Sequence, residues 1–271
     1  MTGARRTTRK FPITVINIPI DLRYKYFERT NLQMNNNDIK ITVITVSFNA
    51  KDALEKTMHS VIMQDYKNVE YIIIDGGSTD GTPSMLRGYD GKIDRWVSEP
   101  DNGIYDAMNK GVALATGDYC IFMNAGDCFA DSSTISRATE DFLDADVIYG
   151  DITKDGKLKR SLSPRNCHKM FYCHQAAFIR TSLLREFPFD IRHRFSADFK
   201  QTKQLYLAGK KFRQANIVIA IFDTTGISNT QRSKGLRDNI KVINEVDSFS
   251  EKARLLPRIL LTYWMCRLRG K

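Results

Sequence analysis

Five polar side chains stand at or just after the ends of apolar segments in the first half of this 271-residue chain. They are Asp75, Asn102, Asp106, Asn124 and Asp127. In open α/β sheets ligands bind outside the carboxyl ends of the strands, so we expect these side chains to meet there. Their oxygens can accept hydrogen bonds from a base or a ribose. Asn124 and Asp127 share a Gly-containing loop and are also suited to a hard divalent cation that bridges to phosphates.

The stretch around Asp75 predicts a strand, a tight turn and a helix start. An apolar run ends at Asp75, and Gly76 and Gly77 allow backbone conformations closed to other residues. Ser78, Thr79 and Asp80 can cap a following helix. The alternative is an Asp-Gly-Gly turn without a ligand, and this motif alone leaves both interpretations open.

The composition favours a globular protein with an anionic partner. The chain is 42% hydrophobic and carries a formal net charge of +10. Such a charge suits a phosphorylated ligand, a lipid surface or nucleic acid, but no nucleic-acid-binding motif is present. The five cysteines form no disulfide pattern, and Cys167-His168 and Cys173-His174 do not have the spacing of a zinc site. A cytosolic compartment fits best.

The pattern of apolar runs predicts a largely parallel sheet covered by helices on both faces. Strands are expected at 41–46, 71–74, 93–97, 119–123 and 147–149, with helices at 51–63, after Ile104 and at 132–143. After Gly150 we expect a hairpin at 151–163, strands at 174–179 and 212–222, and helices at 196–207 and 231–246. Residues 1–38 form an N-terminal appendage and linker.

One expected helix and one terminal segment have a mixed character. In the helix after Gly103, Asn102, Asp106 and Asn109 line one face with Lys110 beside it. In the terminal segment 252–271, an apolar stripe is flanked by basic residues, which is typical of a helix in a membrane interface. The stripe consists of Leu256, Ile259, Leu260, Tyr263 and Trp264. A helix packed on the domain with a basic tail is the open alternative.

No apolar run reaches the ~20 residues needed to span a bilayer, and the N-terminus lacks the pattern of a signal peptide. We therefore expect a soluble protein or one that lies on a membrane.

Residues from about 40 to 222 resemble the family 2 glycosyltransferases of the GT-A fold. The matching segments are Ile44-Thr-Val-Ser-Phe-Asn49, Ile74-Asp-Gly-Gly-Ser-Thr-Asp-Gly-Thr82, Ser98-Glu-Pro-Asp-Asn-Gly-Ile-Tyr-Asp-Ala-Met-Asn-Lys-Gly111, Phe122-Met-Asn-Ala-Gly-Asp127 and His174-Gln175. The third segment looks especially like the colanic-acid and amylovoran type of bacterial exopolysaccharide transferases.

The resemblance implies an α/β GT-A fold with a C-terminal amphipathic helical segment. The GT-A domain would span 39–225, with a nucleotide-sugar half at about 39–130 and an acceptor half at about 131–225. Residues 226–271 would form C-terminal helices that contact the membrane surface. The implied reaction is inverting transfer of a sugar from a UDP- or GDP-linked donor to a saccharide or lipid-linked saccharide. It would take place at the inner face of the cell membrane.

The resemblance also assigns roles to individual residues. Asp198 would be the catalytic base, with His174 beside it on the acceptor side. Asp127, with Asn124, would hold Mn²⁺ or Mg²⁺ on the diphosphate. The expected donor and acceptor contacts are Thr45, Val46, Ser47, Asn49, Asp75, Gly76, Asp101, Asn102, Asp106, Asn109, Lys110, Asn124 and Gln175.

Three positions depart from the family pattern. Asn124 stands where the first Asp of the metal motif is usual, Ala197 precedes the base in place of Glu, and Met108 replaces a frequent Arg. Two alternatives therefore stay open. One is a degenerate protein that binds a nucleotide-sugar without turnover. The other is a nucleotidyltransferase, although no Gly-rich triphosphate loop follows the first strand.

Overall fold

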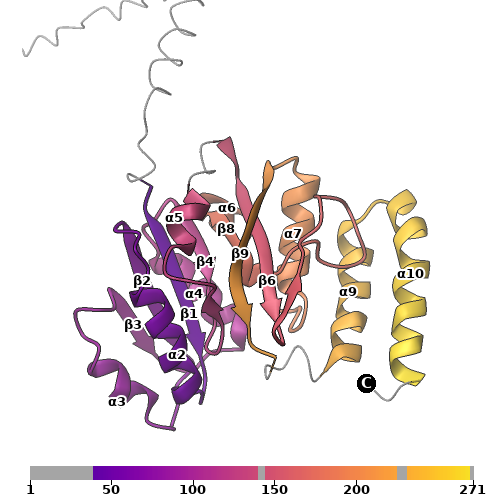
Figure 1. Cartoon of the computed structure of the whole chain (residues 1–271). Coiled ribbons are helices and arrows are strands. Elements are labelled where there is room, and N and C mark those ends of the chain that lie inside the picture. The colour runs from indigo at the N-terminus through magenta and orange to yellow at the C-terminus, as the bar shows by residue number, and fades with distance from the viewer. Residues whose placement is uncertain (1–38, 140–143, 225–230, 269–271) are drawn as a thin grey trace, which may run out of the picture. The chain divides into compact units, whose positions relative to one another are not determined.

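The computed structural model describes residues 39–139, 144–224 and 231–268. The described residues belong to one compact unit (Figure 1). The expected appendage 1–38 lies outside the described residues, as do parts of the expected helix at 132–143 and of the terminal segment.

The unit is built on a nine-stranded mixed sheet with the order β3-β2-β1-β4-β8-β6-β9-β5, and β7 pairs with β6. The strands are β1 Ile41–Ser47, β2 Val69–Asp75, β3 Arg95–Ser98, β4 Tyr119–Phe122, β5 Cys128–Phe129, β6 Val147–Lys154, β7 Lys157–Lys159, β8 Ala177–Arg180 and β9 Phe212–Phe222. Neighbours among β1–β4 are parallel, as are β6 and β9. β8 runs antiparallel to β4 and β6, and so joins the two parallel parts.

Helices α2 to α7 flank this sheet, and α9 and α10 pack beyond α7 (Figure 1). They are α2 Lys51–Ile62, α3 Thr82–Arg87, α4 Ile104–Leu114, α5 Thr134–Thr139, α6 Thr181–Glu186, α7 Ala197–Leu207, α9 Arg232–Val246 and α10 Phe249–Leu268, with a 3₁₀ turn η3 at His174–Ala176. None of the described helices is both long and apolar enough to cross a membrane.

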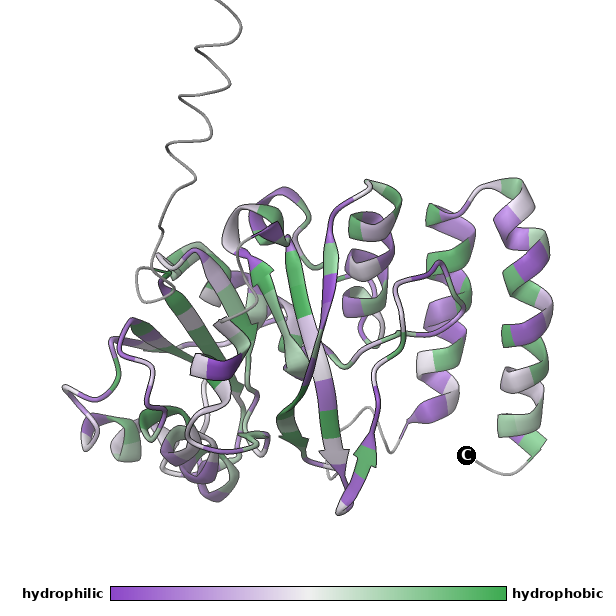
Figure 2. Cartoon of the chain, turned by 45° about the horizontal axis from the view of Figure 1, so that its top comes forward, coloured by the Kyte–Doolittle hydropathy of each residue, from purple (hydrophilic) through white to green (hydrophobic). Residues whose placement is uncertain are grey.

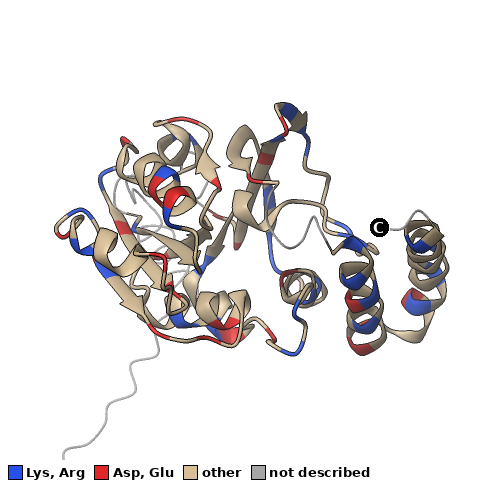
Figure 3. Ribbon diagram, turned by 90° about the horizontal axis from the view of Figure 1, so that it is seen from below, with Lys and Arg blue, Asp and Glu red and all other residues tan. Residues whose placement is uncertain are grey.

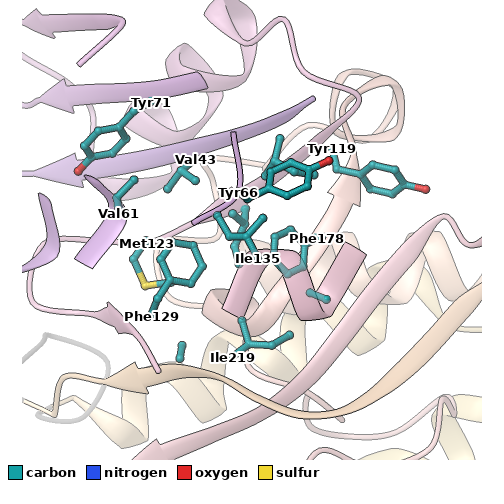
Figure 4. Packing of buried hydrophobic residues seen from close by; sticks show 14 of the residues in the cluster. Val43, Val61, Tyr66, Tyr71, Tyr119, Met123, Phe129, Ile135, Phe178 and Ile219 are labelled. Atoms are coloured by element: carbon teal, nitrogen blue, oxygen red, sulfur yellow. The ribbon is translucent and has the colours of Figure 1, made fainter. Parts of the chain in front are cut away.

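Apolar side chains on successive strand residues point to opposite faces and form two cores. Along β1, Val43 belongs to the core that also includes residues of α2 and α5, while Ile44 belongs to the core that includes residues of α4 and α6. Figure 4 shows Val43 near other buried residues of the first core. A third, small core unites α7, α9 and α10. It contains Phe199, Val242, Ile243, Leu255 and Ile259.

The predicted α/β fold with a mostly parallel sheet is confirmed. The strands predicted to begin at residues 41, 71, 119, 147 and 212 all form. The hairpin predicted around Asp155-Gly156 forms between β6 and β7, with positive φ at both residues. The strand predicted at 174–179 is wrong at its start, because His174–Ala176 form a 3₁₀ turn before β8. Alternation of apolar residues could not reveal that the Gln175 side chain turns inward to hydrogen-bond Cys173.

Candidate active site at the ends of the central strands

The loop after β4 is held rigidly against its neighbours. Asn124 and Asp127 form a tight turn in which the Asp127 N–H donates to the Asn124 carbonyl at 2.9 Å. Between them Gly126 has φ of 104°, a conformation that favours glycine, and its N–H donates to Thr57 Oγ1 of α2 at 2.9 Å. The Ala125 N–H donates to Val46 at the end of β1. The predicted cation loop therefore lies directly beside the end of the first strand.

Asp127 is buried, with 4% of its surface exposed. Burial raises the pKa of its carboxyl to about 6. The hydrogen bond from the Asp223 N–H and the nearby His174 and Gln175 act in the opposite direction and lower this pKa. Asp223 follows β9, and its carboxylate lies against the loop: a Cβ on Gly126 would stand 2.5 Å from Asp223 Oδ2. The negative charge of Asp223 raises the pKa of Asp127 further. A cation at this position would relieve the cost of holding these carboxylates close together.

Asn124 supplies a neutral oxygen at the same place. Its side-chain nitrogen lies 3.4 Å from His174 Nε2, while its Oδ1 is buried and has no hydrogen-bond partner among the described residues. A buried polar atom without a partner is uncommon and calls for an explanation such as a missing ion or water. Amide and carboxylate oxygens are the ligands that Mg²⁺ and Mn²⁺ accept, so the donor set of Asn124, Asp127 and Asp223 fits a hard divalent cation.

His174 connects this loop to Asp198 in the first turn of α7. His174 Nδ1 lies 3.3 Å from Asp198 Oδ2. The neutral tautomer that carries its proton on Nδ1 donates to Asp198 and accepts from the Asn124 amide, so it satisfies both ring nitrogens. The imidazole thus stands between the candidate cation ligands and the predicted base.

The Asp198 carboxylate receives two further hydrogen bonds on its other oxygen. The Tyr105 hydroxyl donates to Oδ1 at 2.9 Å, and the Phe199 N–H donates at 2.8 Å. Burial by itself raises the pKa of Asp198, but the hydrogen bonds from His174, Tyr105 and Phe199 oppose it, and the pKa is lowered. Asp198 is therefore an ionised, oriented proton acceptor at neutral pH.

Asp75 is held differently. It is fully buried, and its carboxylate accepts hydrogen bonds from Ser78 N–H at 2.9 Å, Ser78 Oγ at 2.5 Å and Ser98 Oγ at 2.7 Å. A carboxylate has about four acceptor positions, so these donors occupy most of them. Asp75 lies at the expected strand end and organises the turn between β2 and α3. Its contact with a base or ribose stays a prediction.

The end of β1 presents backbone more than side chains. Thr45 is buried, and its hydroxyl lies 3.0 Å from the Tyr71 hydroxyl within the core. Val46 is buried as well. Ser47 is also buried, and its Oγ has no hydrogen-bond partner among the described residues. Asn49 has φ of 47° and bonds Ser78 and Thr79, so it fastens the β1 end to the turn after β2.

The segment from Asp101 to Lys110 is organised mainly by its own contacts. Asp101 accepts from the Gly103 N–H at 2.8 Å, and Asp106 accepts from the Asn102 N–H at 2.9 Å. Asp101 also closes over Gly76, where an added Cβ would lie 2.5 Å from Asp101 Oδ2.

Two predicted contacts in α4 already have protein partners. Lys110 Nζ lies 2.7 Å from Glu99 and 2.9 Å from the Pro100 carbonyl. The Asn109 amide bonds both the N–H and the carbonyl of Phe189, so it holds the loop before α7 in place. The structure thus brings together Asn124, Asp127, His174, Gln175 and Asp198, while Asn109 and Thr45 lie in structural positions.

Sequence reasoning missed Tyr105 and Asp223. The sequence offers one hint for each of them: Tyr105 lies in the first turn of α4, and Asp223 directly follows an apolar strand. Their partners are 93 and 96 residues away, a separation that only the folded chain closes.

A second acidic group is occupied by a lysine. Asp190, His193 and Glu245 present ligand atoms close to one another. Lys200 Nζ lies among them, 2.7 Å from Asp190 and 2.6 Å from Glu245. Its ammonium takes the position that a cation would need, so we interpret this group as an ion-pair cluster.

Comparison with known proteins places residues 42–206 within the family described as glycosyl transferase family 2. The chain belongs to this family. It is therefore a glycosyltransferase, as the sequence resemblance implied.

Two relatives are similar over most of their length. An uncharacterised glycosyltransferase of Mycobacterium tuberculosis is 30% identical over 219 residues, covering 76% of this chain and 83% of the relative. A PGL/p-HBAD biosynthesis glycosyltransferase of Mycobacterium bovis is 29% identical over 207 residues, covering 70% and 79%. Among solved structures, the mannosyltransferase of Pyrobaculum calidifontis in complex with GDP-Man and Mn²⁺ has a TM-score of 0.63 at 16% identity, covering 90% of this chain and 76% of that one. That similarity supports the GT-A fold.

Proposed function

We propose that this protein is an inverting glycosyltransferase that moves a hexosyl group from a UDP- or GDP-linked sugar to a saccharide acceptor. The observation that carries the proposal is the Asn124–His174–Asp198 array, which sets an ionised carboxylate beside a candidate cation loop at the strand ends. In one displacement the acceptor oxygen bonds to the anomeric carbon as the bond to the diphosphate breaks. Asp198 takes the acceptor proton.

His174 and Tyr105 position that carboxylate. Each donates to a different oxygen of Asp198, which fixes the orientation of the carboxylate and favours its charged form. Ser47 and the backbone around it would face the base and ribose, and Asp101, Asn102 and Asp106 would shape the donor side. Asp75 would contact the base or ribose in addition to holding the turn after β2, while Lys110 would act mainly by holding its own segment.

The proposed cofactor is Mn²⁺ or Mg²⁺, held by Asn124, Asp127 and Asp223. Such a cation stabilises the charge of the departing diphosphate when bound. The Mn²⁺ in the complex of the structurally similar mannosyltransferase supports this choice of cofactor class.

We further propose a lipid-linked saccharide acceptor in the synthesis of an exopolysaccharide, capsule or other bacterial cell-surface glycan, of which the colanic-acid and amylovoran type is one form. The relative named for PGL/p-HBAD biosynthesis supports this class of pathway. The enzyme would then work in the cytoplasm, at the inner face of the cell membrane.

The test combines binding and turnover. Wild-type protein and Asp127→Ala are melted with UDP, GDP and a panel of their sugars, with and without Mn²⁺. A ligand at a hundred times its dissociation constant adds about 2.7 kcal/mol to stability, so a metal-dependent rise with one nucleotide class is expected for the wild type only. No rise with any nucleotide would overturn the proposed function.

Two alternatives give different results in the same assays. A degenerate binding protein, which Asn124 and Ala197 would favour, shows the melting shift but releases no nucleoside diphosphate, and Asp198→Asn changes nothing. A nucleotidyltransferase releases pyrophosphate from a nucleoside triphosphate. For the proposed enzyme, Asp198→Asn retains donor binding and loses about 10²–10⁴ in kcat, the usual contribution of general base catalysis.

The cation loop allows a sharper test with a matched control. Gly126→Ala would place a Cβ 2.5 Å from Asp223 Oδ2 and displace that carboxylate. Gly156→Ala is the control. Gly156 also has a positive φ, of 71°, but an added Cβ there would meet nothing within 4 Å. We expect Gly126→Ala to lose the Mn²⁺-dependent melting shift and Gly156→Ala to keep it. Equal behaviour of the two variants would exclude Asp223 from the cation site.

A further inference from the structure

Helix α10 has two apolar faces, and only one of them is covered. Leu255, Ile259 and Cys266 are buried, and the first two belong to the small core shared with α7 and α9. On the other side, a second row of large apolar side chains is exposed to solvent by 40% to 86%. We call this row the outer face of α10; it consists of Leu260, Leu261, Trp264, Met265 and Leu268. Bands of apolar residues follow α10 along its length in Figure 2.

The outer face forms one continuous arc. At 100° per residue, its five members fall within about 140° of the helix circumference, opposite the buried row. Arg267 lies at one edge of this arc, and Arg258 lies at the other. Basic bands on α9 and α10 are visible in Figure 3. A helix that packs on its own domain needs one apolar stripe, so the second stripe calls for another partner.

A group of cations lies next to this helix, on the loop that leads from β7 to η3. It contains Arg165 and Lys169 of the loop together with Arg258 of α10, and we call these three residues the cationic rim. His168, half-buried on the same loop, has a pKa lowered by burial and then by the charges of Lys169, Arg258 and Arg165.

The rim and the outer face belong to the same piece of structure. The Arg254 side chain of α10 donates to the Asn166 carbonyl of the loop at 3.0 Å, and Asn166 Nδ2 in turn donates to Glu251 at 2.9 Å. Arg165, Lys169 and Arg258 form no ion pair with an acidic side chain in the described parts of the chain, and all three are exposed. The cationic rim and the outer face of α10 thus form one surface, in which the cations have no acidic partner among the described residues and the apolar side chains are uncovered.

We propose that the outer face of α10 and the cationic rim dock this protein on an anionic lipid bilayer. The apolar arc would enter the boundary between headgroups and acyl chains, and the rim would contact lipid phosphates. A second copy of the chain fits less well, because a symmetric pair through α10 would bring the two sets of arginines together. The docking does not depend on sugar transfer, so it can be tested without donor or acceptor.

The first experiment is sedimentation of the full chain with vesicles of phosphatidylcholine, with and without phosphatidylglycerol. Binding is expected to the phosphatidylglycerol vesicles and to weaken with salt. Lys169→Gln with Arg258→Gln should lower the partition constant about thirtyfold, since each surface cation contributes about fivefold. The control is Lys67→Gln with Lys92→Gln. It removes the same charge from exposed positions just before β2 and β3 and should retain wild-type partitioning.

The second experiment locates the insertion. The chain has two tryptophans, and Trp96→Phe leaves Trp264 as the reporter. Its fluorescence should shift to the blue on phosphatidylglycerol vesicles and be quenched by brominated lipids. Leu261→Gln with Leu268→Gln changes exposed positions only and should abolish both effects while the circular dichroism stays unchanged.

Three results would overturn the proposal. The first is no binding to anionic vesicles. The second is an equal loss in the rim and control variants, which would mean that net charge alone draws the protein to lipid. The third is a wild-type dimer in solution that Leu261→Gln with Leu268→Gln disperses, since a second copy would then cover the outer face. None of these results bears on the melting shift with nucleotides.

Discussion

At the scale of single residues, the environment of Asp198 decides what its motif could not. In the sequence it is an Asp in the first turn of an expected helix, preceded by Ala197. In the structure its two oxygens have separate partners, His174 on one and Tyr105 on the other. A residue whose only role was to interact with the helix dipole would not need a buried tyrosine and an imidazole directed at it.

This arrangement predicts a shift in the pH profile of Tyr105→Phe. The Tyr105 hydroxyl helps to lower the pKa of Asp198, and the base works only when ionised, so activity is present above that pKa. Removing the hydroxyl raises the pKa and should move the acidic limb of kcat/KM to higher pH. Tyr149→Phe is the control, since its hydroxyl donates to the Leu162 carbonyl and not to Asp198. Identical limbs in the two variants would exclude Tyr105 as a positioning residue.

At the scale of elements, the site depends on how closely α4 approaches the sheet. Gly111 faces Ile44 of β1, where a Cβ would stand 2.5 Å from the isoleucine Cγ2. The missing side chain allows the helix to lie against β1 and β2, and so places Tyr105 at the N-terminal end of α4 within reach of Asp198. In the sequence Gly111 is only the last residue of a family-like segment, and nothing local shows this contact.

We expect Gly111→Ala to destabilise the protein by about 1–3 kcal/mol, because an added methyl group overpacks this contact. Gly235→Ala, in the first turn of α9, meets nothing within 4 Å and should stabilise by roughly 0.5–1 kcal/mol through helix propensity. Urea unfolding of both variants measures the difference. A stabilising Gly111→Ala would mean that α4 and β1 are less tightly packed than the structure shows.

At the scale of the whole molecule, the C-terminal helices are joined to the catalytic segment by polar contacts as well as by the small core. His193 and the Phe195 N–H both bond Asp238 of α9, and Lys203 of α7 pairs with Asp247 at 2.8 Å. Lys200 lies between Asp190 and Glu245. Since Asp198 lies in the first turn of the helix that these groups hold, the position of the proposed base depends on the C-terminal helices.

The Lys200 cluster predicts how stability changes with pH. Hydrogen bonds from Arg192 and then from Lys200 hold the pKa of Asp190 below its usual range. A hydrogen bond from Lys200 is the main cause that lowers the pKa of Glu245. Stability from such groups is fully present above the unfolded pKa of about 4 and is lost as the pH falls below it.

Lys200→Met should therefore cost about 2–3 kcal/mol at pH 7, less than a fully buried pair because Glu245 is 42% exposed, and the deficit should shrink at pH 3. Lys211→Met removes an exposed pair with Asp144 and should change little at either pH. Guanidinium unfolding at the two pH values measures both variants. A deficit that stays constant with pH would contradict the role of these carboxyls.

The sequence by itself determined the fold class and the segments that we propose for the site, because both depend on local patterns. Runs such as Ile41–Ser47 and Val69–Asp75 are rich in Ile and Val, and the turns after them contain Gly, Asn and Asp at the positions that need them. Asp127 and His174 could be named for the same reason: each stands in a short motif.

Only the tertiary structure decided which of these residues act together. Asp223 meets Asp127 across 96 residues, and Asn109 turns away to hold Phe189. The terminal apolar stripe also divides only on folding, with Ile259 buried and Leu260 exposed. Hydrogen bonds and burial depend on the distance between segments in space, and that distance is set by strand register and helix packing over the whole chain, which no local pattern contains.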